Sequence, residues 1–360
     1  MAKPRLVAAV LALSAAFAAM GVHQGHEYTT TSSASVSPRA FVVGKTGLVQ
    51  VVDTRSGAVL ARADTGGRAT GVAVSPDGQR LYVINGWTGA ITVVDPFTGA
   101  VLDRIFTQVQ LSHAAMRPDG QRLYVSASGG VAVVDPQNFR LVAAVKVNGQ
   151  PEGLAVHPNN KILYVANAQD GTVGIVDTAT AFQTSAVQVG GLPQFLALSP
   201  DGKRLYVSSM RLGQKTPGTL SVIDTTTNEV VGSLPVGRGA GSIAVTPDGA
   251  TVYLALPKEG SVAVVDAATM TLRSRLPIDT QGVAIAPGDP RVFFATGATT
   301  TVLDSSNAVL ATYRMKSGEL QETRPRQFDA AMIAFASGQP TPTGSRISSS
   351  QSSKSSTGSS

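Results

Sequence analysis

Short apolar runs separated by Gly, Pro, Asn and Asp recur along most of the chain, a pattern typical of strands joined by tight turns. An aspartate ends such a run seven times, at intervals of 42, 40, 42, 47, 42 and 38 residues. The seven copies are Val52-Asp53, Val94-Asp95, Val134-Asp135, Val176-Asp177, Ile223-Asp224, Val265-Asp266 and Leu303-Asp304. A period near 40 with strand-like content predicts a β-propeller with one blade per repeat.

The repeat at residues 70–105 indicates how each blade is built. Its predicted strands are Val72–Ser75, Arg80–Ile84, Ala90–Val94 and Ala100–Ile105. The turn Pro76-Asp77-Gly78 separates the first two, because Pro fixes φ and Gly accepts a positive φ. We therefore expect an all-β fold, a seven-bladed β-propeller of four-stranded antiparallel blades.

The first repeat, Phe41–Ala63, lacks a clear first strand. The segment Ala330–Ala336 has the composition of a first strand. If this C-terminal strand joins the first blade, it closes the ring and removes both open edges. A short surface helix is the alternative for Ala330–Ala336.

The second predicted strand carries a family resemblance. Tyr82-Val83-Ile84-Asn85 and Tyr164-Val165-Ala166-Asn167 nearly spell the sequence Tyr-Val-Thr-Asn, and the Pro-Asp-Gly-x-Arg-Leu-Tyr-Val block matches the same repeat. Over about residues 40–336 the chain resembles the YVTN-repeat propellers, which include periplasmic YncE-like proteins. The resemblance implies the fold and leaves the function open, because the shared residues belong to the scaffold.

The two ends differ from the repeats in composition. Residues 1–19 resemble a signal peptide, with Lys3 and Arg5 before an apolar stretch, which predicts an exported, periplasmic or secreted protein; an uncleaved anchor is the alternative. We expect no membrane span once this segment is removed. Residues 20–39 are predicted to be a flexible lead-in, residues 40–336 the propeller, and residues 337–360 a disordered Ser-rich tail.

Composition narrows the classes of partner. The net charge is +6, but four of the basic residues lie in the signal and the tail, where no acidic residue offsets them. No cluster of Lys and Arg with interleaved aromatic residues is present, so no nucleic-acid partner is evident. The chain has no cysteine, which excludes disulfides and attachment of c-type haem. We expect a monomer without cofactor or metal.

The loops at one mouth of the predicted channel are rich in Gln and Arg, which suit a small polar or anionic ligand or a protein partner. The candidate ligand-binding residues are Arg68, Trp87, His113, Glu152, Gln194, Arg238, Gln281 and Arg326. The loop residues among them are alternatively solvated, and Trp87 alternatively packs on a neighbouring blade. His113 starts the first strand of its blade, which lines the channel, and is alternatively a channel histidine whose hydrogen bonds are satisfied within the protein. Since His is the side chain that titrates nearest neutral pH, His113 and Glu152 are the candidates for proton transfer.

Three functions fit this sequence. The regular repeats and the missing catalytic motifs favour a binding or interaction scaffold over an enzyme. The second possibility is a lyase, lactonase or isomerase that uses the channel mouth. The third is a propeller subunit of a periplasmic redox complex, in which a partner carries the redox centre.

Overall fold

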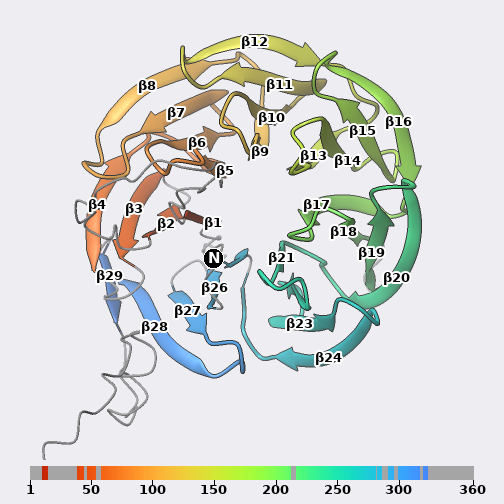
Figure 1. Ribbon diagram of the computed structural model, residues 1–360. Coiled ribbons are helices and arrows are strands. Elements are labelled where there is room, and N and C mark those ends of the chain that lie inside the picture. Colours follow the sequence, from red (N-terminus) through yellow and green to blue (C-terminus); the bar gives the residue numbers. More distant parts are fainter. Residues whose placement is uncertain are drawn as a thin grey trace, which may run out of the picture. The chain divides into compact units, whose positions relative to one another are not determined.

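The computed structural model describes residues 10–14, 39–43, 47–53, 58–211, 216–280, 282–285, 291–295, 299–316 and 319–322. All of them belong to the first of two compact units, residues 1–323, and the second unit comprises residues 324–360. The described residues form seven antiparallel sheets in a ring, as the repeats predict (Figure 1). In this part of the chain no helix is long and apolar enough to cross a membrane.

Each blade places its strands in chain order from the centre of the ring to the rim (Figure 1). Blades 1 to 4 consist of β1 (Val10–Ser14), β2 (Arg39–Val43), β3 (Leu48–Asp53) and β4 (Val59–Asp64); β5 (Ala69–Val74), β6 (Leu81–Asn85), β7 (Ala90–Val94) and β8 (Val101–Phe106); β9 (Leu111–Met116), β10 (Leu123–Ala127), β11 (Gly130–Asp135) and β12 (Arg140–Val145); and β13 (Pro151–Val156), β14 (Ile162–Asn167), β15 (Thr172–Asp177) and β16 (Phe182–Gln188).

The remaining blades follow the same plan, and blade 7 adds a fifth strand. Blades 5 to 7 consist of β17 (Leu192–Leu198), β18 (Arg204–Met210), β19 (Gly218–Asp224) and β20 (Glu229–Gly237); β21 (Ile243–Val245), β22 (Thr251–Leu256), β23 (Ser261–Asp266) and β24 (Thr271–Leu276); and β25 (Gly282–Ile285), β26 (Val292–Ala295), β27 (Thr299–Leu303), β28 (Val309–Lys316) and β29 (Glu319–Glu322).

The recurring aspartate shapes the turn between the third and fourth strands. In blade 4, Asp177 Oδ1 accepts the backbone N–H groups of Ala179 (2.9 Å) and Thr180 (2.8 Å), and Ala181 adopts a φ of 59°. Next to this turn the register of the third and fourth strands shifts in every blade. Such a bulge twists the rim strand and protects it from pairing with another chain. The aspartates are therefore turn residues.

The core of the described residues is divided into seven apolar clusters, one at each junction between neighbouring blades. The cluster at the junction of blades 7 and 1 contains Val52 together with Phe293, Ala295 and Val302. The first and last blades thus pack against each other. Because neighbouring blades bury each other's apolar faces, the ring is one continuous packed structure.

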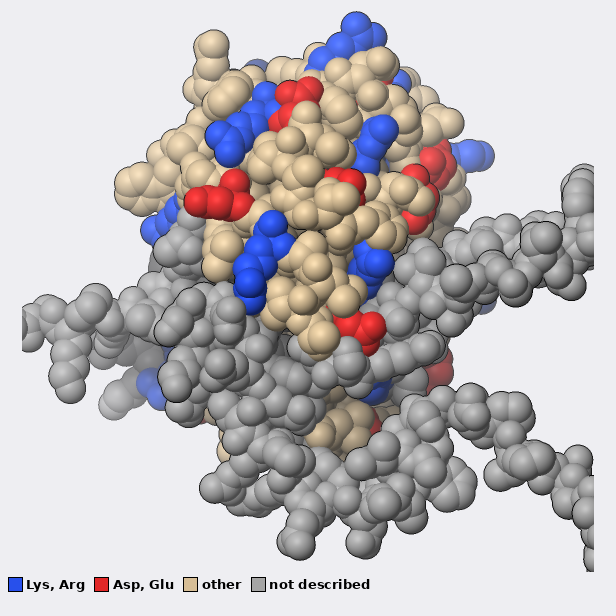
Figure 2. Space-filling view, turned by 90° about the vertical axis from the view of Figure 1, so that its left-hand side faces the viewer, with Lys and Arg blue, Asp and Glu red and all other residues tan. Residues whose placement is uncertain are grey.

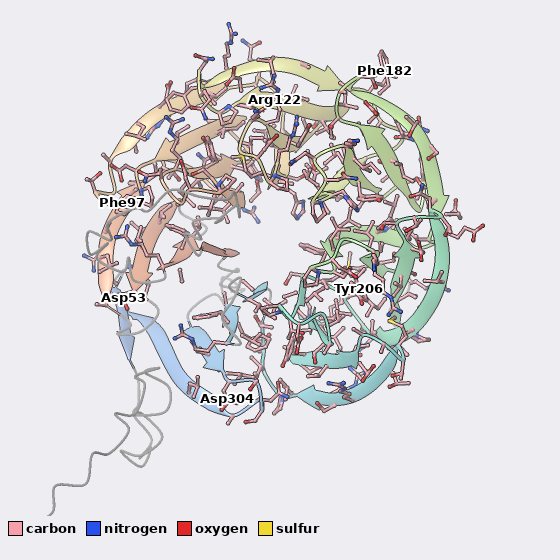
Figure 3. The ribbon with its side chains drawn as sticks, viewed as in Figure 1. Asp53, Phe97, Arg122, Phe182, Tyr206 and Asp304 are labelled. Carbon is pink, nitrogen blue, oxygen red and sulfur yellow. The ribbon has the colours of Figure 1, made fainter. Side chains whose placement is uncertain are left out.

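The Arg-Leu-Tyr segments join neighbouring blades. The Arg80 guanidinium (2.7 Å) and the Tyr82 hydroxyl (3.3 Å) both donate to the carbonyl oxygen of Pro136, which follows the turn aspartate of the next blade. Between blades 6 and 7, the Tyr253 hydroxyl donates to Asn307 Oδ1 (2.8 Å). The phenols are buried, and desolvation raises the pKa of Tyr164 to about 12. Figure 3 shows Tyr206, at the equivalent position, within its blade.

In the structure the inner place of blade 1 is taken by β1, which pairs antiparallel with β2. The segment Ala330–Ala336, predicted for this place, lies outside the described residues, so closure by that strand stays a prediction. β1 lies within residues 1–19, the predicted signal peptide. If that segment is removed on export, β2 needs another inner neighbour.

Opposite charges lie close together on the surface. Figure 2 shows Lys and Arg interspersed with Asp and Glu on the face in view. Arg117 and Asp119, which are 2.9 Å apart, form one such pair. In such a pair each charge is partly cancelled by its neighbour, so the electrostatic potential is weak at a distance. A ligand site on this protein is therefore defined by local geometry rather than by a large surface of one charge.

Candidate functional site

One position in or next to the inner strands carries different residue types in different blades. Its occupants in blades 2 to 7 are Gly71, His113, Gly153, Phe195, Ser242 and Gly282. The glycines allow neighbouring inner strands to come close. A Cβ on Gly153 would lie only 2.5 Å from the carbonyl oxygen of Gln194 and 3.0 Å from the Cα of Phe195. His113 is the one titratable residue at this position.

His113 on β9 and Phe195 on β17 contact each other across blade 4. Their rings meet edge to face, with centroids 5.2 Å apart. They belong to blades 3 and 5, and the residue between them in blade 4 is Gly153, which has no side chain. The absence of a side chain on Gly153 therefore leaves room for this contact.

The His113 imidazole also faces a carboxylate. Its Nδ1 lies 3.5 Å from Glu152 Oε2, and the two side chains are 27% and 20% exposed. This is an ion-pair distance, longer than a well-formed hydrogen bond. Both side chains are partly exposed, so both can meet a ligand, although His113 Nδ1 itself is buried.

The backbone and side chain of Glu152 are held by further polar groups. The hydroxyl of Ser126, on blade 3, donates to the Glu152 carbonyl oxygen. The Gln150 amide donates to Glu152 Oε1 (3.2 Å), and the Gln169 amide donates to Gln150 Oε1 (3.4 Å). The carboxylate is therefore oriented by an amide network rather than by an arginine.

The predicted arginines make contacts of their own. The Arg68 guanidinium lies 5.9 Å from the centre of the Trp87 ring, and Trp87 is 74% exposed rather than packed on a neighbouring blade. The Arg238 backbone N–H donates to Glu259 Oε1 (2.7 Å), and its Nε lies 4.0 Å from the same oxygen. Arg275 binds the other oxygen of Glu259 at 3.1 Å.

The structure thus brings His113 and Glu152 together, two of the eight residues predicted for the site. Gln194 is half-buried on β17, next to Phe195. Gln281 and Arg326 lie outside the described residues. His157, which follows β13, accepts the Asn159 N–H at Nδ1 (3.1 Å) and so belongs to a turn.

Phe195 and Ser126 are not among the residues predicted from the sequence, which are mostly polar loop residues. Phe195 is apolar, and Ser126 lies within a buried strand. Aligning the inner strands identifies Phe195, because it occupies the position of His113 in another blade. Ser126 carries no comparable signal, since its role depends on the backbone of the next blade.

The described residues contain no group of three or more His, Asp or Glu side chains that could hold a metal ion. What the site offers is an imidazole, a carboxylate and two amides beside an aromatic ring. These groups can hydrogen-bond a polar molecule, and the imidazole–carboxylate pair can exchange a proton with it.

No protein-family model and no curated protein matches the chain. Solved structures do match the chain. A chain of Kuenenia stuttgartiensis hydrazine synthase matches with a TM-score of 0.63 and 21% identity, covering 72% of this chain and 96% of that one. The β-propeller domain of Myceliophteria thermophila Cps50 (Swd1) matches with a TM-score of 0.61 and 12% identity, covering 75% and 91%. At these identities the matches establish the fold class, a β-propeller, and no activity.

Proposed function

We propose that the protein is an exported binding scaffold of the YVTN-repeat type, which holds a small polar ligand at the mouth of its channel. The observation that carries the proposal is the His113–Glu152 pair, in which two half-buried polar side chains from neighbouring blades lie 3.5 Å apart. Ligand sites are commonly concave, with a few polar groups that fix orientation.

The surroundings of the pair support a binding role. The amides of Gln150 and Gln169 orient Glu152, and the Phe195 ring restricts His113. A site of this kind is preorganised, which lowers the cost of ordering side chains on binding. Arg68 and Arg238 interact with Trp87 and Glu259, so a ligand with hydrogen-bond donors suits the pair better than an anion.

Calorimetric titration with ethanolamine, ethylammonium, acetate and inorganic phosphate tests the proposal. We expect ethanolamine or ethylammonium to bind the wild-type protein. The variants His113→Ala and Glu152→Gln should each weaken binding at least tenfold, which is about 1.4 kcal/mol. His157→Ala removes a histidine from an outer turn and should bind as the wild type does. Binding unchanged in both site variants, or none of the four probes bound, contradicts the proposal.

A second candidate is a propeller subunit of a larger assembly. It is favoured by the match to a chain of hydrazine synthase, which is covered over 96% of its length. The exposed Trp87 would serve as an anchor for a partner. Size-exclusion chromatography of the protein from its native host tests this: elution at monomer mass in fresh extracts opposes the assembly.

A further inference from the structure

Two exposed aromatic residues lie at the same end of blade 2. Trp87 belongs to the turn between β6 and β7 and is 74% exposed, and Phe106, the last residue of β8, is 64% exposed. Phe106 pairs with Ala90, which directly follows the turn that carries Trp87. Exposed apolar groups that gather in this way, rather than lying singly, are typical of interaction sites.

Two arginines lie beside these aromatic residues, and both belong to blade 2. The Arg68 guanidinium lies 5.9 Å from the centre of the Trp87 ring. The Arg104 guanidinium lies against the loop between β4 and β5, because a Cβ on Gly66 would be 3.5 Å from Arg104 Nη2. Gly66 and Arg68 are part of the same loop, so this loop brings both guanidinium groups to one end of the blade.

The side chains of Arg104 and Phe106 point to the same side of β8, toward blade 1. Side chains alternate along a strand, and Ile105, which lies between these two residues, packs in the cluster that joins blades 2 and 3. The opposite side of β8 is the one on which Gly66 meets Arg104. Together these residues form a blade 2 patch, which consists of Arg68, Trp87, Arg104 and Phe106.

The guanidinium groups of the patch form no ion pair among the described residues. The two nearby carboxylates bind backbone groups instead. Asp64 Oδ1 accepts the Gly66 N–H (2.9 Å), and Asp103 Oδ1 accepts the backbone N–H of Arg104 (2.6 Å). A carboxylate of a partner can therefore form charge-assisted, bidentate hydrogen bonds with either arginine.

The same aspartates limit how much negative charge a partner can carry. A nucleic-acid backbone needs a positively charged groove that follows its phosphates, and it would be repelled by Asp64 and Asp103. A peptide with separated carboxylates and apolar side chains between them matches both the arginines and the rings. Rings as exposed as these suit a protein surface better than a small ligand, which binds in a concave site.

We propose that the blade 2 patch docks an acidic segment of a protein partner. The carboxylates of the segment pair with Arg68 and Arg104, and its apolar side chains cover Trp87 and Phe106. Aromatic residues and arginine are the types that contribute most to binding at protein interfaces. This inference is independent of the ligand at the His113–Glu152 pair, and it gives the second candidate function the chemistry of its partner.

The fluorescence of Trp87 reports on the patch directly, because the chain has one tryptophan. We would titrate the full-length protein with three tryptophan-free peptides of equal length, which repeat Gly-Leu-Glu, Gly-Leu-Gln or Gly-Leu-Lys. The Glu peptide should shift the emission to shorter wavelength, because the ring leaves water, and should bind at least tenfold more tightly than either other peptide. Equal affinity for the Glu and Gln peptides, or no shift with the Glu peptide, overturns the proposal. Tighter binding of an oligothymidylate than of the Glu peptide overturns the choice of a protein partner.

Variants separate the patch from other exposed residues of the same types. Arg68→Ala, Arg104→Ala and Phe106→Ala should each weaken binding of the Glu peptide at least fivefold. Arg140→Ala on β12 and Phe182→Ala on β16 (Figure 3) remove an exposed arginine and an exposed phenylalanine from other blades. These matched controls should bind the peptide as the wild type does, and an equal loss in controls and patch variants overturns the proposal.

One further variant distinguishes this proposal from the proposed function. His113→Ala, which should lose the small polar ligand, should bind the Glu peptide as the wild type does. If His113→Ala loses the peptide as fully as Arg104→Ala does, the patch is not a separate site and this inference is overturned. Loss of the small ligand alone leaves the inference standing.

Discussion

At the scale of single residues, the repeat position shared by Gly153 and His113 has two uses. A glycine there lets neighbouring inner strands pack closely, and a larger residue contributes a side chain to the site. Gly153 lets β13 and β17 approach, and its missing side chain leaves room for His113 to reach Phe195. The sequence predicted that His113 lies on an inner strand at the channel. It could not predict the contact with Phe195, because residues two blades apart meet only through the curvature of the ring.

Replacing Gly153 by alanine tests this packing. The new Cβ would lie 2.5 Å from the Gln194 carbonyl oxygen, so β13 and β17 must separate. We expect a loss of about 1–3 kcal/mol of unfolding free energy, in the range of other overpacked sites. Gly232→Ala is the control, because its Cβ would meet only Met270 Cγ at 3.5 Å, an ordinary contact. Denaturant unfolding measures both, and equal stability of the two variants contradicts the packing argument.

The turn aspartates predict how stability depends on pH. Backbone hydrogen bonds, first those from Thr180 and Thr226, lower the pKa of Asp177 and Asp224 respectively. A carboxyl whose pKa is lower in the folded chain than in the unfolded chain stabilises the fold fully at pH values above its unfolded pKa, about 3.9. This contribution is lost as pH falls through the folded-state pKa. Melting temperatures at pH 7 and pH 3 should therefore differ less in Asp177→Asn than in the wild type. An equal difference would show that the turn bonds do not favour the ionised form.

At the scale of elements, the sequence predicted the strands well because strand and turn signals are local. Pro-Asp-Gly and the aspartate hairpin each fix a turn within a few residues. The inner strand of blade 1 is different, since its partner comes from elsewhere in the chain. The sequence favours Ala330–Ala336, whereas the structure describes β1 there. β1 and, by prediction, Ala330–Ala336 are thus alternatives for one place beside β2.

Truncation distinguishes the two segments. If Ala330–Ala336 is the inner strand of the exported protein, a chain lacking residues 1–19 should melt like the full-length chain. Removing residues 328–360 as well should lower its melting temperature sharply, because β2 then exposes unpaired backbone groups. Removing residues 341–360 alone should change little. Should β1 be the permanent inner strand, loss of residues 1–19 alone would cause the fall, and thermal denaturation would show it.

At the scale of the whole molecule, the ring is held by apolar junctions between neighbouring blades, and these junctions differ in whether the two blades follow each other in the chain. Six junctions join blades that follow each other in the chain, and the seventh joins blade 7 to blade 1. Figure 3 shows Asp304 of blade 7 and Asp53 of blade 1, whose blades meet there. Consecutive blades are linked by short loops, whereas in the described residues blades 7 and 1 meet by packing. We expect the ring to open first at this junction.

Two neighbouring residues on β26 test where the ring opens. Phe293 and Phe294 point to opposite faces of the strand, so Phe293 packs in the cluster between blades 7 and 1, and Phe294 in the cluster between blades 6 and 7. Both are buried, and alanine at either costs about 3–5 kcal/mol of local packing. By hydrogen–deuterium exchange, Phe293→Ala should speed exchange in β2 to β4 and leave blades 3 to 5 protected. In Phe294→Ala, the matched control, exchange rates in β2 to β4 should stay closer to those of the wild type, and exchange in β22 and β23 should become faster. If Phe293→Ala instead speeds exchange equally in all seven blades, the ring unfolds as one unit and has no weakest junction.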